Sequence, residues 1–266
     1  MRISPIAVAV LFAAMTTGAK ADGLVLYGAG SLREAMGQVA LEFGKAHDLV
    51  VTTQFGNSGS MRERIEKGDK VDVFTSADVG HARKLLDDGR ADVMVMFARN
   101  RVCLLSPAKF GATTETALQK MVSEGVRIGM SPPKADPLGD YTVQLFEKAD
   151  QVKAGSEAVL QARAVVLQSP PAGPAAKSGD TDVDAIQDGR IDASIVYCSI
   201  SERYARLLPS ATVVAFPPEL QVGPEYALAV LKNARPEAYQ LALTILSAAG
   251  QKILADRGFI PVALPH

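Results

Sequence analysis

The sequence contains no tryptophan, and aromatic residues make up only 6% of its 266 residues. Sites that stack nucleobases or sugars depend on aromatic side chains, so this scarcity argues against such ligands. The 28 Lys and Arg residues are balanced by 29 Asp and Glu residues, which gives a formal net charge of −1. A chain without a basic excess is not built to bind nucleic acid.

Residues that bind metals or cofactors are also few. The chain has two cysteines and three histidines, His47, His81 and His266, without the spacing of a zinc site. It contains no G-K-[ST] sequence, and Arg33 occupies the third glycine position of a G-x-G-x-x-G motif that would begin at Gly28. We therefore expect no nucleotide, no bound metal cation and no cofactor.

A catalytic centre is not indicated either. Ser58 lies in N-S-G-S and not in the G-x-S-x-G of hydrolases. His47 and His81 fall in polar helical stretches that are typical of solvent-exposed residues. Asp72 and Asp78 flank a predicted strand and resemble turn or cap residues. We predict that the protein is not an enzyme.

Long apolar runs are absent except at the N-terminus. Arg2 precedes the run IAVAVLFAAM at 6–15, and Ala19-Lys20-Ala21 then matches the small-x-small rule of signal peptidase. A membrane anchor is the alternative, but the run is shorter than the ~20 residues that cross a bilayer. We predict a signal peptide over residues 1–21, cleaved on export to the periplasm.

Export gives the two cysteines two alternative interpretations. In an oxidising compartment, Cys103 and Cys198 could form a disulfide. Both also fall in predicted strands, where two separate thiols would pack as small apolar side chains. The residues alone leave these alternatives open.

Short β-rich segments alternate with helical segments along the chain. Strands are predicted at 24–30, 50–56, 71–77, 101–107, 126–131, 162–167, 193–198, 212–217 and 226–231, and helices at 31–47, about 59–67, after Asp78, within 135–149, at 181–189 and at 236–257. This order predicts an α/β fold with parallel sheets and helices on both faces. The strands are too many for one compact sheet. We expect two doubly wound lobes: lobe I over 22–100 and 218–266, and lobe II over 101–217.

Three predicted helix starts share a feature that suits an anion. Ser31 and Ser58 each lie where a strand ends and a helix begins, and a Pro-Gly turn at 136–141 opens a third helix. The first N–H groups of a helix are unpaired and carry partial positive charge, so several together can bind a small oxyanion. A serine in such a place is often only an N-cap. Tyr197, at a strand end, is either a hydroxyl donor to this site or a packed core residue.

Seven segments carry a family resemblance: GAGSLREAM, FGNSGSMRERIEKG, VDVFTSAD, FARNRVCLLSP, DPLGDYTVQLFEKA, DGRIDASIVYCS and GQKILADRGF. In this order, over nearly the whole mature chain, they resemble the periplasmic molybdate-binding proteins of ABC transporters. The resemblance implies a type II periplasmic-binding-protein fold, with two lobes joined by a hinge. It implies a molybdate or tungstate anion held only by neutral donors, an ABC permease as partner and a monomeric receptor.

The resemblance also assigns site residues. Ser31 and Ser58 match two serines that contact the anion through hydroxyl and backbone N–H groups. Tyr197 matches a tyrosine whose hydroxyl donates to the anion. Leu138 matches a backbone N–H donor, and an ungapped count back from Tyr197 places the last donor at Gly179.

Two positions depart from the family pattern. Leu138 is bulkier than the small residue often found there, and Cys198 replaces a glycine that frequently follows the tyrosine. The two cysteines suggest a subgroup, with a linking disulfide as one option. The alternative ligand is another small anion, such as sulfate, phosphate or a small carboxylate. A carboxylate receptor would offer an arginine in the cleft, and Arg99 and Arg101 near the hinge are the candidates.

Overall fold

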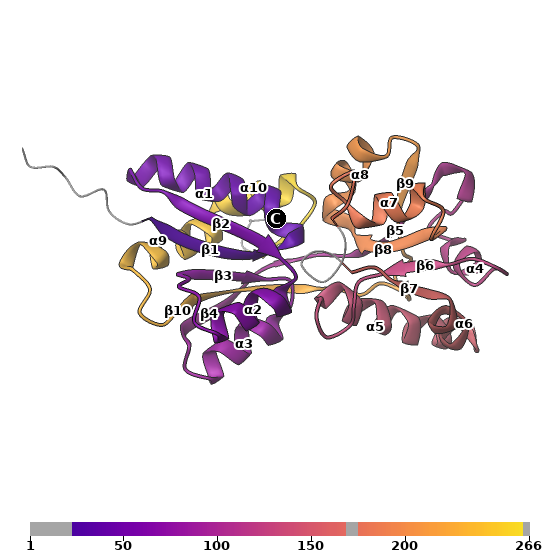
Figure 1. The fold of residues 1–266 in the computed structure, drawn as a ribbon, viewed down its shortest axis with the longest axis horizontal. Helices are drawn as coiled ribbons and strands as arrows, with labels where there is room; N and C mark the ends of the chain where they lie inside the picture. The colour runs from indigo at the N-terminus through magenta and orange to yellow at the C-terminus, as the bar shows by residue number, and fades with distance from the viewer. Residues whose placement is uncertain (1–22, 169–174, 263–266) are drawn as a thin grey trace, which may run out of the picture.

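The structure, a computed structural model, describes residues 23–168 and 175–262. These residues form two lobes, each built on one β-sheet with helices on both faces (Figure 1). The predicted signal peptide at 1–21 lies outside them. Within the described ranges, no helix is both long enough and apolar enough to span a bilayer.

The sheet of the first lobe has the strand order β11-β4-β10-β3-β1-β2. Its strands are β1 (Leu24–Ala29), β2 (Val51–Gly56), β3 (Val73–Ser76), β4 (Ala91–Arg99), β10 (Glu225–Leu231) and β11 (Ile260–Pro261). β1 pairs in parallel with β2 and β3, as the alternating pattern predicts. β10 is antiparallel to β3 and β4. The sheet is therefore mixed and not parallel throughout, because β10 re-enters it on the way back from the second lobe.

The sheet of the second lobe has the order β7-β6-β8-β5-β9. Its strands are β5 (Val102–Pro107), β6 (Ile128–Met130), β7 (Ala164–Val166), β8 (Ala193–Tyr197) and β9 (Ala211–Ala215). β6 is parallel to β7 and β8, whereas β5 is antiparallel to β8 and β9. The chain leaves the first sheet between β4 and β5 and returns between β9 and β10, so two segments connect the lobes (Figure 1).

Helices cover both faces of each sheet. In the first lobe, one face carries α1 (Arg33–His47), α9 (Pro236–Leu246) and α10 (Ala248–Asp256), and the other carries α2 (Ser58–Glu66) and α3 (Val79–Asp87). In the second lobe, one face carries α4 (Ala117–Met121), α5 (Pro137–Val152) and α6 (Ser156–Arg163), and the other carries α7 (Thr181–Gln187) and α8 (Ser201–Leu207). Three 3-10 turns complete the description: η1 (Gly30–Leu32), η2 (Ala108–Phe110) and η3 (Cys198–Ile200).

The side chains of β10 pack against the helices on both faces of the sheet. Tyr226, Leu228 and Val230 belong to the apolar cluster under α1, α9 and α10. Ala227 and Ala229 belong to the cluster under α2 and α3. Side chains alternate across a strand, so a strand buried on both sides has a continuous apolar sequence.

Several elements differ from the sequence-based expectation, since α4, α6, α8 and β11 were not predicted. The helix predicted at 236–257 is two helices, because the backbone of Ser247 is extended, with ψ at 161°. The Ser247 hydroxyl accepts a hydrogen bond of 3.2 Å from the Gly250 N–H and so caps the start of α10. β4 has no counterpart among the predicted strands. The predicted cap of α3 is confirmed, since Asp78 accepts from the Gly80 N–H at 2.6 Å.

Candidate functional site

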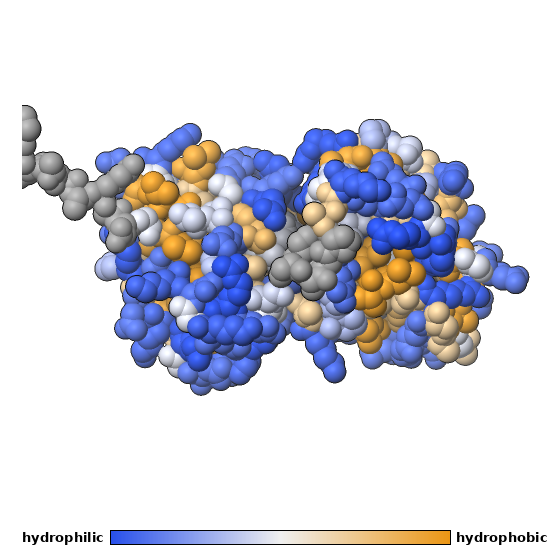
Figure 2. Space-filling model, in the orientation of Figure 1, coloured by the Kyte–Doolittle hydropathy of each residue, from blue (hydrophilic) through white to orange (hydrophobic). Residues whose placement is uncertain are grey.

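A cavity of about 510 Å³ lies between the two lobes. Figure 2 shows the lobes as two masses on either side of a waist. Residues at the ends of β1, β2 and β8 line this cavity, as expected for a ligand site in α/β folds. The lining includes all five residues expected to contact the anion: Ser31, Ser58, Leu138, Gly179 and Tyr197.

Two strand ends form the wall that the first lobe contributes. β1 runs into η1, which holds Ser31, and β2 ends at Gly56, two residues before Ser58 opens α2. Among the described residues, the backbone N–H groups of Ser31 and Ser58 have no hydrogen-bond partner. Two unpaired backbone donors therefore belong to one wall of the cavity.

Each of the two serine hydroxyls has a hydrogen-bond partner within the protein. The Ser31 hydroxyl lies 3.0 Å from the Tyr226 hydroxyl, which itself accepts from the Asn100 amide at 3.1 Å. Tyr226 can therefore give its own proton to Ser31. The Ser58 hydroxyl accepts from the Ala77 N–H at 3.1 Å. The Ser58 hydroxyl thus keeps its proton for a ligand, and the Ser31 hydroxyl does so when Tyr226 is the donor of their shared hydrogen bond.

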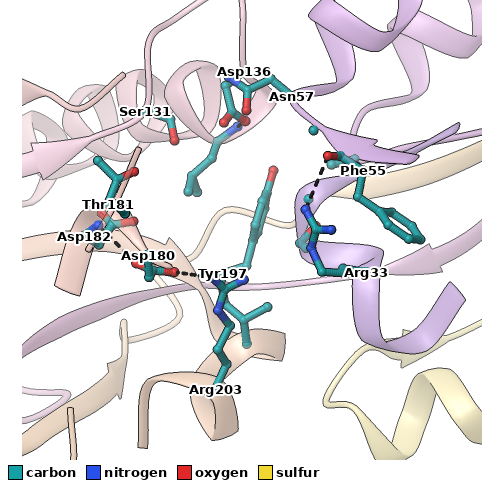
Figure 3. A pocket seen from close by; sticks show the side chains of 18 of the residues that line it. Arg33, Phe55, Asn57, Ser131, Asp136, Asp180, Thr181, Asp182, Tyr197 and Arg203 are labelled. Atoms are coloured by element: carbon teal, nitrogen blue, oxygen red, sulfur yellow. Dashed lines mark hydrogen bonds and ion pairs between the residues drawn. The ribbon is translucent and has the colours of Figure 1, made fainter. Parts of the chain in front are cut away.

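Tyr197 comes from the second lobe, at the end of β8. Its hydroxyl is buried and has no hydrogen-bond partner among the described residues. Figure 3 shows the Tyr197 ring between residues of the two lobes. Burial raises the pKa of the Tyr197 phenol well above 10, so this group stays a hydrogen-bond donor at neutral pH.

The two predicted backbone donors of the second lobe are already engaged. The Leu138 N–H donates to the Asp136 carboxylate at 3.1 Å, because Asp136 is the N-cap of α5. The Gly179 N–H donates to the carbonyl of Ala176 at 3.2 Å, in a turn where Gly179 has a φ of +80°. The structure thus places both residues at the cavity but pairs their N–H groups inside the protein.

A better-placed donor lies two residues after Gly179. Thr181 is the first residue of α7, and it also lines the cavity. Its N–H has no partner among the described residues, whereas the next two N–H groups of the helix bind the Asp180 cap. The ungapped count did not reach Thr181, because it assumed a fixed spacing back from Tyr197.

Charged side chains also line the cavity. The family resemblance implied only neutral donors to the anion, so these charged groups were not expected there. They are Arg33, Asp136, Asp180, Asp182 and Arg203. Asp136 and Asp180 could be recognised in the sequence as residues before a helix. Arg33 was visible only as a break in a glycine motif, and no pattern indicated Arg203. The two arginines expected near the hinge lie elsewhere: Arg99 pairs with Glu225 at 3.1 Å, and neither it nor Arg101 lines the cavity.

Burial raises the pKa of all three carboxyls of the cavity, Asp180 included. Burial raises the pKa of Asp136 to about 6. Burial, followed by the nearby charge of Asp180, raises the pKa of Asp182 to about 7. Each is enclosed by protein while keeping some contact with the cavity. Both carboxyls therefore hold a proton part of the time near neutral pH, which reduces their repulsion of an anion.

Cys103 and Cys198 form a disulfide. Cys103 lies in β5, where it is opposite Val196 of β8, and Cys198 directly follows Tyr197. The bridge ties the end of β8 to its neighbour in the sheet. It therefore fixes the backbone next to the tyrosine that enters the cavity.

Except for Ser58, the residues set aside as catalytic candidates do not line the cavity. His47 stacks on Phe43 with ring centroids 4.1 Å apart, and Asp72 accepts from the Val25 N–H at 2.8 Å. Neither they nor His81 line the cavity. Within the described part of the chain, no cluster of three His, Cys, Asp or Glu residues could hold a metal ion.

Comparison with known proteins gives several relatives. An uncharacterized protein of Pasteurella multocida is 33% identical over 238 residues, which cover 88% of this chain and 96% of that protein. The molybdate/tungstate-binding protein WtpA of Pyrococcus abyssi is 24% identical over 225 residues, covering 71% of this chain and 63% of WtpA.

Solved structures show the same fold. The periplasmic molybdate-binding protein of Azotobacter vinelandii has a TM-score of 0.72 at 21% identity, covering 91% of this chain and 100% of the other. The sulfate-binding protein SubI of Mycobacterium tuberculosis H37Rv has a TM-score of 0.76 at 15% identity, covering 91% and 87%. These likenesses establish two lobes of the periplasmic-binding-protein type.

The family described as bacterial extracellular solute-binding protein matches residues 24–260. That range contains both lobes and every residue named at the cavity. The match agrees with a cleft that binds a solute and lacks a catalytic constellation. The chain belongs to this family of non-enzymatic receptors, which bind a solute outside the cell for ABC transport.

Proposed function

We propose that this receptor captures a tetrahedral oxyanion in the interlobe cavity and that molybdate or tungstate is its ligand. The observation that carries the proposal is the Tyr197 hydroxyl, which is buried, protonated and without a partner among the described residues. A buried donor without an acceptor is unfavourable, so it indicates a group that arrives from outside. An oxyanion supplies that acceptor.

The donors around Tyr197 suit four oxygens of one small anion. The hydroxyls of Ser31 and Ser58 and the N–H groups of Ser31, Ser58 and Thr181 complete the set. Hydrogen bonds from neutral donors to a charged oxygen are stronger than those between neutral groups. Donors from both lobes would converge on one anion, so binding would favour the closed arrangement of the lobes.

The names of relatives support this assignment. WtpA is a molybdate/tungstate-binding protein, and the structure from Azotobacter vinelandii is a molybdate-binding protein. SubI, with a similar fold, is a sulfate-binding protein, so sulfate is the nearest competing inorganic ligand. All three names describe receptors of tetrahedral oxyanions.

Export, closure of the lobes and delivery of the ligand are proposed from the family and from the predicted signal peptide. We propose that residues 1–21 direct export to the periplasm and that the mature receptor acts as a monomer. Lobe I at 22–100 and 218–266 would close on lobe II at 101–217 around the two connecting segments. The closed form would then deliver its ligand to an ABC permease.

The test is a titration of the purified mature protein with molybdate, tungstate, sulfate and phosphate at equal ionic strength. We expect thermal stabilisation by molybdate and tungstate, about 4 kcal/mol at a thousandfold excess over the dissociation constant. Tyr197→Phe and Ser58→Ala should each weaken molybdate binding by about 1.5–3 kcal/mol, roughly tenfold to hundredfold. Tyr239→Phe, an exposed tyrosine of α9, is the matched control.

Unchanged molybdate affinity in both cavity variants would contradict the site. A response to sulfate or phosphate alone would keep the site and replace the ligand. A second candidate ligand, an organic anion, is favoured by one specific observation: the arginines of the cavity.

A further inference from the structure

Two arginines from opposite lobes line the oxyanion cavity. Arg33 begins α1 in the first lobe, and Arg203 lies in α8 of the second. In Figure 3 the Arg203 side chain lies below Tyr197 and the Arg33 side chain lies to the right of it. Burial, followed by the charge of Arg203, lowers the pKa of Arg33. The two cations are thus close enough to repel each other, and an anion between them would relieve that repulsion.

Arg203 is held in place and still has free donors. Its Nη2 donates to the Gly179 carbonyl at 2.6 Å and lies 3.2 Å from the Asp180 carboxylate. Both contacts use the same nitrogen, and a guanidinium has five N–H donors. The two contacts therefore orient the Arg203 side chain and leave other N–H groups of the guanidinium free to bind a ligand.

Arg33 is more weakly engaged. Its only side-chain hydrogen bond within the described residues is a contact of 3.3 Å from Nη2 to the Phe55 carbonyl. Its guanidinium also stacks over the Phe55 ring, 5.3 Å from the centroid. A planar guanidinium placed in this way can bind a carboxylate through two parallel hydrogen bonds.

The cavity also has acceptors, which an inorganic dianion cannot use. Asp136 and Asp182 of the second lobe both line it. Asp136 accepts a hydrogen bond from the Leu138 N–H, and Asp182 accepts one from the Ser194 hydroxyl. Their remaining oxygens would repel a bare oxyanion, whereas ligand hydroxyl groups would donate to them.

The cavity is also larger than an inorganic oxyanion requires. Four oxygens at about 30 Å³ each, the volume of a water in the liquid, fill about 120 Å³. The cavity has about 510 Å³, although the lobes already touch at two places. Glu34 and Arg206 form an ion pair of 2.7 Å, and the Tyr141 hydroxyl lies 3.2 Å from Asp78.

We infer that Arg33 and Arg203 form a second anion subsite beside the donors of Ser31, Ser58 and Tyr197. The cleft then takes a small hydroxylated organic anion with a phosphoryl group and a carboxylate. The phosphoryl group occupies the oxyanion site, the carboxylate lies between the arginines, and hydroxyl groups face Asp136 and Asp182. This inference rests on the proposed oxyanion site and extends its ligand class from inorganic anions to organic ones.

The test compares 2-phosphoglycerate with glycerol 2-phosphate by calorimetric titration. These molecules differ only in a carboxylate that replaces one hydroxymethyl group. We expect 2-phosphoglycerate to bind at least tenfold more tightly. Arg33→Gln should abolish that difference and leave the affinity for molybdate within threefold. Arg99→Gln, which alters an exposed arginine outside the cavity, should leave the difference intact.

Arg203→Gln tests the same subsite from the second lobe and should also abolish the difference between the two esters. If loss of the Arg203 contact with Asp180 unfolds α7, Arg33→Gln, which breaks no such contact, decides the test. Equal affinity for the two phosphate esters would overturn the subsite. Binding of molybdate without either ester would also overturn it while leaving the proposed function intact. Failure of every anion, molybdate included, would overturn both.

Discussion

Glu34 of the first lobe and Arg206 of the second form an ion pair of 2.7 Å beside the cavity. Glu34 also pairs with Arg257 of its own lobe at 3.0 Å. One carboxylate therefore joins α1 and α10 to α8 across the gap between the lobes. Both partners are substantially exposed, so the contact contributes at most about 1 kcal/mol.

This ion pair should bias the receptor toward its closed arrangement. Arg206→Gln is expected to increase the radius of gyration of the ligand-free protein in X-ray scattering, with no change in the ligand-bound form. High salt should produce the same change in the unaltered protein, because it screens exposed charges. Lys252→Gln, which breaks an exposed pair within α10, is the control. Identical scattering of the variant and the unaltered protein would refute this role.

The disulfide between Cys103 and Cys198 should stabilise the fold considerably, because 95 positions separate its ends. Closing a loop of that size restricts the unfolded chain by about 4 kcal/mol in the chain-entropy model. A reductant should therefore lower the denaturation midpoint of the oxidised protein. The double variant Cys103→Ala/Cys198→Ala should show the lower midpoint with or without reductant. Two reactive thiols in the unfolded, unreduced protein would disprove the bridge.

The raised acidity constants of the cavity carboxyls predict a pH dependence. Burial raises the pKa of Asp182 to about 7, above the about 4 of an unfolded carboxyl. Between these values the folded protein binds more protons than the unfolded one. Stability is therefore lost as the pH rises through this window, by at most about 1.4 kcal/mol per pH unit for this group.

Asp182→Asn should remove that loss, so we expect it to raise the free energy of unfolding more at pH 8 than at pH 5. Urea denaturation at both values measures the difference. The exposed carboxyl Asp256, changed to Asn, is the control and should show no such divergence. An equal effect of Asp182→Asn at the two pH values would contradict the assignment.

Gly139 allows the start of α5 to approach the segment before it. A Cβ at this position would lie 2.6 Å from backbone atoms of Ser131, Pro132 and Pro133. Gly139→Ala should therefore displace α5 and the adjacent Leu138, reducing stability by about 1–3 kcal/mol and weakening anion binding. Gly37→Ala in α1 meets nothing within 4 Å and should stabilise the helix by about 0.5–1 kcal/mol. Calorimetry measures the melting temperatures of the two variants. Equal melting temperatures would contradict the predicted difference between Gly139 and Gly37.

Several features could be predicted from the sequence because they depend on neighbouring residues. The alternation of apolar and helical segments predicted β1, β2 and β3 and their parallel pairing. Asp78 could be recognised as a helix cap because its side chain bonds an N–H two residues away. The break at Ser247 escaped prediction, since the apolar period continues through it and only the extended backbone ends the helix.

The sequence by itself determined the α/β pattern, the family and the serine and tyrosine positions at strand ends, because these follow from local periodicity and colinear motifs. Tertiary structure alone decided what meets across the cavity. Arg33 and Arg203 are 170 residues apart in the chain, and the antiparallel return of β10 depends on the passage through the second lobe. Contacts of that kind arise from the docking of two lobes, and no local pattern in the chain encodes them.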